Sequence, residues 1–407
     1  MDSTAVRGSR AGNVHLSRMS AGLFTSVSSS KVLFALWVLG TAVIESQGIP
    51  PAPTATRANG AAVRVTVKPD PVYVERSEIG QHLNFEFLLG NLTDQEFLLT
   101  GIEVSIFDDG GRLARRDFVN RFSRTSLEIP PRRVLRARQS TLVFNPFHSF
   151  AASVPLKRLR YEFAFGTDDG RVRHTSVAEV VPVLYETKTP LVLPVKGRVL
   201  VWDGHDYHSH HRRMDYTLPV FQTRQMTTNF QRYGYDLVIV NEQGVMYRGA
   251  SKDSDDWYRG RPDDNEAYLA FGQPVHAAGA GRVVDLHDGE ADNRRFDPAE
   301  FMKRATAGSG NYVVIDHLNG EFSWFGHLKQ GSIRVKRGQS VKQGDILGLI
   351  GASGDSLFPH LHYELRTGPG ITGVEGLPSY FSGFRRVGSQ ALVGRGQLDS
   401  GDVVENR

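Results

Sequence analysis

The sequence contains no cysteine among its 407 residues. Disulfide bonds and thiolate zinc sites are therefore excluded, and only histidine, aspartate or glutamate side chains remain to hold a metal ion. The same absence leaves the redox compartment of the protein open.

The sequence also lacks a large excess of either positive or negative charge. The 48 lysines and arginines nearly balance the 44 aspartates and glutamates, for a net charge of +4. Part of this excess (Arg7, Arg10, Arg18 and Lys31) lies near the N-terminal end. This balance gives weak support for an anionic partner such as a cell-wall polymer, and it argues against nucleic acid, whose binding requires concentrated basic surfaces.

The apolar run near the N-terminus is too short to cross a membrane. It covers residues 32–44, whereas a membrane-spanning helix needs about 20 residues. Because basic residues precede the run, it is typical of a signal peptide. We predict that residues 1–48 are a signal peptide or, alternatively, an uncleaved N-terminal anchor, the one expected membrane contact. The protein is then exported to the periplasm, the cell envelope or the extracellular space. Prolines after Gly48 predict an extended linker at 49–61.

Residues 62–195 are predicted to form short β-strands. Apolar and polar residues alternate at 63–67, 83–87, 102–106, 140–144 and 161–165, and glycine-rich turns separate several of these runs. This spacing favours a β-sandwich, with an immunoglobulin-like arrangement as one form of it. Its histidines are scattered, so we predict no catalytic cluster in this module.

The character of the chain changes beyond residue 195, where ten of the fourteen histidines lie at or after His205. Several fall in a loop-like stretch at 203–215. The most informative pair is His360 and His362, because residues two apart on a strand face the same side, about 7 Å apart. One imidazole of such a pair can bind a metal while the other transfers protons. Two ordinary buried sheet residues, or a solvated polar loop, would give the same local patterns.

Several motifs in the second half of the chain occur in a characteristic order. They are Gly272–Ala278, Gly310–His317, Gly326–Leu328, Val341–Asp345, Ile350–Gly354 and Pro359–Glu364. Together they resemble the lysostaphin/LytM-type zinc metallopeptidases, which cut peptide bonds in bacterial peptidoglycan. The resemblance extends from about Trp202 to Leu365. It implies an antiparallel β-sheet peptidase domain, which we place at 196–383, so that the whole chain is all-β. The Gly- and Ser-rich residues 384–407 are predicted to be a disordered tail.

The resemblance also implies a set of site residues. Zn²⁺ is expected to be bound by His211, Asp236 and His362, with His327 and His360 assisting catalysis. Asp215 is the alternative to Asp236, because His211 and Asp215 have the compact spacing of the family's first motif, whereas the sequence around Asp236 resembles a split form of that motif. His210 is the alternative to His211, and His205 and His208 are less favoured.

The implied function is a zinc metalloendopeptidase acting on peptidoglycan stem peptides or cross-bridges. Two imidazoles and one carboxylate would leave zinc an open position for a water, whose pKa the ion lowers to about 7. The two remaining histidines titrate in the range needed for proton transfer. The alternative is a non-hydrolytic LytM-like module that binds the cell wall or activates other hydrolases. Because the chain retains every type of ligand, we favour the hydrolase.

Overall fold

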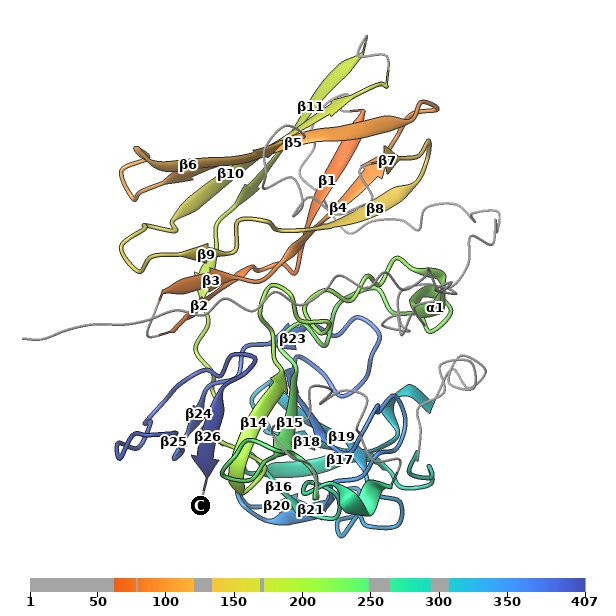
Figure 1. Ribbon diagram of the computed structural model, residues 1–407. Helices are drawn as coiled ribbons and strands as arrows, with labels where there is room; N and C mark the ends of the chain where they lie inside the picture. The colour runs from red at the N-terminus through yellow and green to blue at the C-terminus, as the bar shows by residue number, and fades with distance from the viewer. Residues whose placement is uncertain are drawn as a thin grey trace, which may run out of the picture. The chain divides into compact units, whose positions relative to one another are not determined.

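The computed structural model describes residues 62–77, 80–120, 134–168, 172–248, 264–293 and 307–406 (Figure 1). The predicted signal peptide or anchor and the predicted linker lie outside these residues. The prediction of an all-β chain is confirmed. The helical segments within the described ranges are the four-residue helix α1 (Pro219–Gln222) and the 3₁₀ turns Asn265–Ala267 and Ala307–Ser309. No helix in this part of the chain is long and apolar enough to span a bilayer.

The first twelve strands form what we call the N-terminal module. They are β1 (Val63–Lys68), β2 (Tyr73–Arg76), β3 (Gln81–Leu83), β4 (Glu86–Asn91), β5 (Phe97–Phe107), β6 (Leu113–Asn120), β7 (Val134–Leu135), β8 (Ser140–Phe144), β9 (Ser149–Phe150), β10 (Arg158–Gly166), β11 (Arg173–Val180) and β12 (Val183–Leu184). The alternation of apolar and polar residues along these strands determines which side chains are buried. In β10, Leu159, Tyr161 and Phe163 are fully buried while the residues between them are not, as the two-residue period of a strand requires.

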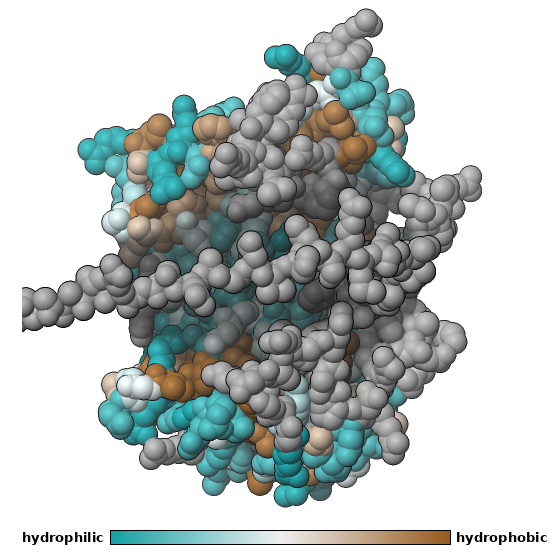
Figure 2. Space-filling model, in the orientation of Figure 1, coloured by the Kyte–Doolittle hydropathy of each residue, from teal (hydrophilic) through white to brown (hydrophobic). Residues whose placement is uncertain are grey.

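The module contains three sheets, with strand orders β1-β4-β8, β11-β10-β5-β6 and β12-β2-β3-β9, and β7 pairs with β5. Phe87, Val104 and Phe163 belong to one hydrophobic core to which the first two sheets both contribute. The strands of the module are confirmed, whereas the sandwich and its immunoglobulin-like form stay predictions. Leu113 and Phe118 of β6 are exposed, and hydrophobic surface is visible on this part of the molecule in Figure 2.

The remaining strands form what we call the C-terminal region. They are β13 (Leu191–Val192), β14 (Gly197–Asp203), β15 (Tyr235–Ile239), β16 (Pro274–His276), β17 (Gly281–His287), β18 (Asn311–Asp316), β19 (Phe322–Leu328), β20 (Ser340–Val341), β21 (Ile346–Leu349), β22 (Leu361–Arg366), β23 (Gly376–Leu377), β24 (Phe381–Ser382), β25 (Arg385–Arg386) and β26 (Val403–Asn406). One ten-stranded sheet runs β20-β17-β18-β19-β22-β15-β14-β26-β25, with β23 beside β22. Strand β22 therefore lies between β19 and β15, which brings three predicted site segments together.

The predicted disordered tail is wrong for residues 384–406. Strand β26 pairs with both β14 and β25, and Phe384, Leu398 and Val404 are fully buried in the core of the C-terminal region. The glycines that suggested disorder form tight turns instead, since Gly388 and Gly401 have φ angles of 84° and 89°, which side chains other than glycine rarely adopt. The other domain boundaries stay predictions.

Candidate metal centre

Strand pairing places Asp236 opposite His362. The two are direct partners in the antiparallel pair β15–β22, and Gly326 of β19 is the partner of His362 on the other side. Directly opposed residues in such pairs have Cβ atoms about 5 Å apart. The sheet register therefore sets the Asp236 carboxylate beside the His362 ring, and His327 directly follows the residue paired with His362.

Three imidazoles converge on one oxygen of Asp236. Its Oδ1 lies 3.0 Å from His362 Nδ1, 3.3 Å from His360 Nε2 and 3.4 Å from His211 Nε2. All four side chains are buried. The prediction placed His211, Asp236, His360 and His362 in one site, and the structure brings these four together.

His327 completes the group. Its ring lies 4.9 Å from the His360 ring and 5.6 Å from the His362 ring, centroid to centroid. His327 has a φ angle of 61°, in the left-handed region that residues other than glycine seldom occupy. Its Nδ1 lies 2.8 Å from the Ser353 carbonyl oxygen, and this bond holds the ring in place. Such backbone outliers cluster at functional sites.

The protonation of the rings follows from their other partners. A carbonyl oxygen can only accept, so Nδ1 must donate where it meets one: His327 to Ser353, His360 to Phe358 at 2.8 Å, and His211 to Gly204 at 3.1 Å. In a neutral ring, Nε2 then carries the lone pair. His211 and His360 therefore direct lone pairs at the Asp236 carboxylate, an arrangement that is repulsive unless a cation or additional protons intervene.

His362 is oriented by a carboxylate on its own strand. Glu364 lies two residues further along β22, and its Oε1 is 2.5 Å from His362 Nε2. Arg366 donates to both oxygens of Glu364, at 2.5 and 2.8 Å. The adjacent Arg366 outweighs burial, which alone would raise the pKa of Glu364, and together with His362 lowers it to about 2. The ionised Glu364 accepts Nε2–H, so Nδ1 of His362 faces Asp236.

Glu364, Arg366 and Asp203 also belong to the centre, although they were not predicted from the sequence. The position of Glu364 two residues after His362, on the same face of a strand, was an available signal. Asp203 Oδ2 lies 3.2 Å from His211 Nδ1 and 2.6 Å from His210 Nδ1. Because Asp203 faces the side of the His211 ring opposite Asp236, it orients that ring, as carboxylates behind metal-binding histidines do.

The electrostatics of the centre are those of a cation site. Burial alone would raise the pKa of Asp236, but His211 and His360 hold it well below its usual range. Burial alone would lower the pKa of His362, but its bonds to Asp236 and Glu364 raise it to about 9. Burial and the neighbouring histidines lower the pKa of His327 well below its usual range. The centre therefore favours positive charge near Asp236.

The donors fit a divalent metal ion. Two atoms bound to one tetrahedral ion at about 2.1 Å lie about 3.4 Å apart, and the separations from Asp236 Oδ1 are of this size. The donor atoms of Asp203, His210, His211 and Asp236 also lie within 4.8 Å of one another. This second grouping contains the orienting Asp203, so we regard it as the edge of the same centre.

The side chains of the alternative candidates have partners other than Asp236. Asp215 Oδ1 accepts hydrogen bonds from the backbone N–H and the hydroxyl of Thr217. His205 Nδ1 lies 3.1 Å from Glu75 Oε2, and His205 Nε2 lies 3.0 Å from the Tyr235 hydroxyl oxygen. His210 is half exposed and bonds to Asp203, whereas the adjacent His211 faces Asp236.

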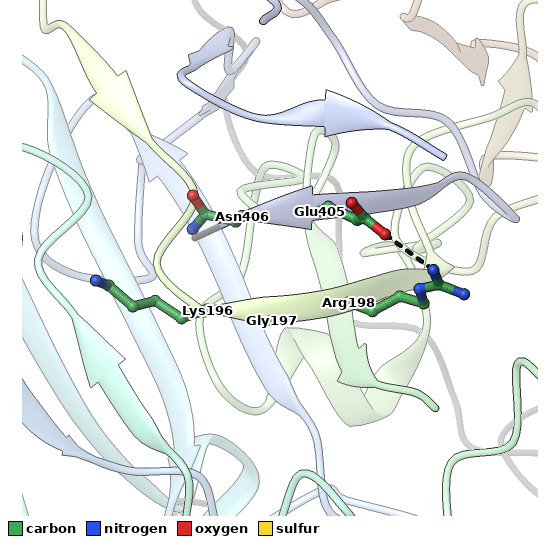
Figure 3. Close-up of a pocket in the computed structure, with 5 residues that line it drawn as sticks. All are labelled: Lys196, Gly197, Arg198, Glu405 and Asn406. Carbon is green, nitrogen blue, oxygen red and sulfur yellow. Dashed lines mark hydrogen bonds and ion pairs between the residues drawn. The ribbon is translucent and has the colours of Figure 1, made fainter. Parts of the chain in front are cut away.

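A surface pocket in the C-terminal region is lined by residues other than those of the candidate metal centre. Figure 3 shows its lining residues on the paired strands β14 and β26 and just before β14, with Arg198 joined to Glu405. The lining residues are Lys196, Gly197, Arg198, Glu405 and Asn406. None is a histidine, and none belongs to the candidate metal centre.

Comparisons with known proteins find similarity in the C-terminal region. Residues 267–373 match the sequence profile of Peptidase family M23. The peptidoglycan DD-endopeptidases ShyA and ShyC of Vibrio cholerae are 38% and 45% identical over 97 and 98 residues, which is 24% of this chain and 18% of each relative. The chain thus covers well under two thirds of these relatives.

A solved structure similar to part of this chain is the catalytic domain of the prophage-encoded M23 protein EnpA from Enterococcus faecalis. It is 30% identical, with a TM-score of 0.21, over 27% of this chain and 69% of that one. The family match includes His327, His360 and His362. The C-terminal region therefore contains a domain of peptidase family M23.

Proposed function

We propose that this protein is a zinc-dependent metalloendopeptidase that hydrolyses peptide bonds in peptidoglycan. The observation that carries the proposal is the convergence of His211, His360 and His362 on the buried carboxylate of Asp236. Two of these rings, His211 and His360, donate Nδ1–H to backbone carbonyls and direct Nε2 at the carboxylate, which is the orientation that metal-binding histidines require.

In this proposal His211 Nε2, Asp236 Oδ1 and His362 Nδ1 hold the ion, and Asp203 and Glu364 orient the two rings. When bound, zinc supplies a Lewis acid that polarises the scissile carbonyl and activates a water. Strand β22 directs His362 toward Asp236 by register, and Arg366 fixes Glu364 behind it. These contacts favour His362 over His360 as the ligand.

His360 and His327 act as the proton-transferring groups. Each donates Nδ1–H to a backbone carbonyl, so the basic atom of each neutral ring is Nε2. A proton removed from the attacking water is held at one of these atoms and passed to the leaving amine. The neutral state of His327, favoured by burial, suits it to accept that proton.

The substrate class and location rest on the named relatives. Two of them are peptidoglycan DD-endopeptidases, and peptidoglycan lies in the cell envelope. We propose that this protein acts there as well, on a peptide of the stem or the cross-bridge.

The test combines metal content with turnover. Purified wild type is expected to contain one zinc per chain and to release dye from labelled peptidoglycan, and His362→Ala is expected to lose both. His276→Ala is the matched control, because His276 lies on β16 and bonds to the Gly344 carbonyl. Zinc without turnover in the wild type would support the non-hydrolytic binding module instead. A wild type that binds no metal would overturn the proposal.

A further inference from the structure

Two of the proposed ligands lie outside the family match. The match begins at residue 267, after both His211 and Asp236. His211 lies in the stretch 204–234, which we call the ligand loop, between β14 and β15. Its one helix is the four-residue α1, so regular hydrogen bonding within the loop does little to fix His211. A ligand on a loop must be positioned by what packs around it.

The N-terminal module supplies the apolar support for the ligand loop. Leu142 and Phe144 of β8 are buried in one hydrophobic cluster with residues of the loop and with Val374. The loop residues in that cluster are Met214, Tyr216, Met226 and Phe230. The main core of the C-terminal region is a separate cluster to which these four do not belong. The loop therefore buries these four side chains against the module and Val374.

A buried ion pair joins the module to the end of the loop nearest Asp236. Arg232 has no exposed surface, and its guanidinium donates to both oxygens of Glu86 on β4 and, at 3.0 Å, to Glu375. The backbone carbonyl of Arg232 accepts from the Asn84 side chain of the module at 2.8 Å. Arg232 precedes Asp236 by four residues, so side chain and backbone are both anchored just before the proposed ligand.

A second anchor adjoins His211. The buried Arg212 donates from Nη2 to the Leu83 carbonyl of β3 at 2.8 Å. Asn229, within the loop, donates to the backbone carbonyls of both His211 and Arg212, at 2.9 and 3.0 Å. The residue next to the first proposed ligand is thus tied to the module on one side and to the rest of the loop on the other.

We propose that the N-terminal module is a working part of the metal centre, in which Glu86, Asn84 and the Leu83 carbonyl position the loop that carries His211 and the entry to Asp236. The proposal rests on the zinc function proposed above. It assigns the module a role that a tethered substrate-binding domain would not have, because these contacts are buried and lie within a few residues of the ligands. Glu86 and Asn84 are positioning residues.

The first test measures zinc affinity in the full-length protein. Glu86→Gln, which removes the charge and keeps the shape, is expected to raise the Kd for zinc about 10-fold, the size typical of losing a group that orients a metal ligand. Glu103→Gln is the matched control, since Glu103 is a half-exposed residue of the module that pairs with Arg116 inside the module. Measurements are made well below the melting temperature of each variant, where a merely destabilised protein binds zinc with wild-type affinity.

The second test does not depend on metal, and it adds a variant that leaves Glu86 unchanged. Asn84→Ala removes the bond to the Arg232 carbonyl without changing any charge. Hydrogen–deuterium exchange without metal is expected to speed up in the ligand loop of Asn84→Ala and of Glu86→Gln, and to stay at the wild-type rate in β18 and β19. Wild-type exchange in the loop together with wild-type zinc affinity in both variants would overturn the inference. Faster exchange in a protein whose wild type binds no zinc would support the positioning and overturn the zinc function.

Discussion

Asp236 and His362 lie 126 residues apart in the sequence, yet His362 Nδ1 is 3.0 Å from Asp236 Oδ1. The contact exists only when β15 and β22 are paired in the observed register. An ion held by both residues therefore binds the folded protein and not the unfolded chain. Metal binding and folding stability must then be linked.

Removing zinc is expected to lower the melting temperature of the wild type. At a free zinc concentration of 1,000 times Kd, binding adds about 4 kcal/mol to the free energy of unfolding. His362→Ala is expected to melt at one temperature with and without chelator. His276→Ala should respond to chelator as the wild type does. Thermal melts recorded with and without zinc measure this, and a chelator effect that persists in His362→Ala would remove this residue from the ligand set.

Asp236 and Asp215 can be distinguished by the same substitution at each position. Asp236→Asn is expected to weaken zinc binding by more than about 100-fold, the upper end for losing an outer partner of a ligand. Asp215→Asn should retain zinc and lose no more than about 1 kcal/mol of stability, because the amide oxygen of asparagine can still accept from the Thr217 backbone N–H. Competition with a zinc-binding dye gives both affinities. Equal losses in the two variants would contradict the assignment.

Glu364→Gln is expected to weaken zinc binding by about 10- to 100-fold with little change in the fold. The amide removes the charge that accepts Nε2–H from His362, so the ring loses its fixed tautomer. The comparison is Glu290→Gln, since Glu290 lies in the same region and contacts the half-exposed His287. Unchanged affinity in Glu364→Gln would mean that β22 alone orients His362.

Much of this centre could be predicted because strands are periodic. The two-residue spacing put His360 and His362 on one side of the sheet, and the apolar residues after Asp236 placed that carboxylate at the start of a strand. His327 followed from the hairpin before it. These inferences needed only local pattern and a family resemblance.

Asp203 could not be predicted in the same way. The pairing of β14 with β15 shifts register between Val201 and Asp203, and irregularities of this kind redirect the next side chain. Spacing also favoured Asp215, whose carboxylate the structure engages locally with Thr217. The prediction of a disordered tail failed because β26 pairs with β14, about 200 residues away in the sequence. The amino-acid composition of the tail does not indicate a strand partner at that distance.

Val404→Ala tests whether the C-terminal residues are part of the core. Val404 is fully buried on β26, and truncating a buried aliphatic side chain costs about 2 kcal/mol. Val387→Ala is the control, because Val387 is 48% exposed and its truncation should change stability by less than about 0.5 kcal/mol. Urea unfolding of the two variants measures the difference. Equal stabilities would mean that the last strand frays in solution.

The contact between Glu75 of the module and His205 of the ligand loop makes stability depend on pH. Burial raises the pKa of Glu75 from 4.5 to about 8, against the opposing effect of Arg212 and with reinforcement from Asp399 and Asp206. Burial lowers the pKa of His205 below 6.5. The raised Glu75 contributes stability that is complete below pH 4.5 and lost as pH rises toward 8, whereas neutral His205 contributes stability that is lost as pH falls below 6.5. The two effects oppose each other below pH 6.5, and of this pair only Glu75 titrates above it.

Between about pH 6.5 and about pH 8.5 the wild type is therefore expected to lose about 2 kcal/mol more of its free energy of unfolding than Glu75→Gln. Glu75→Gln keeps the bond-forming shape and cannot ionise, so it should keep only the slope that comes from other groups, among them His362 with its pKa raised to about 9. Glu103→Gln, the half-exposed control in the module, should fall as the wild type does. Urea unfolding of the three zinc-free proteins at both pH values measures these slopes. A slope in Glu75→Gln equal to that of the wild type would show that Glu75 is ionised in the folded protein, with His205 charged beside it.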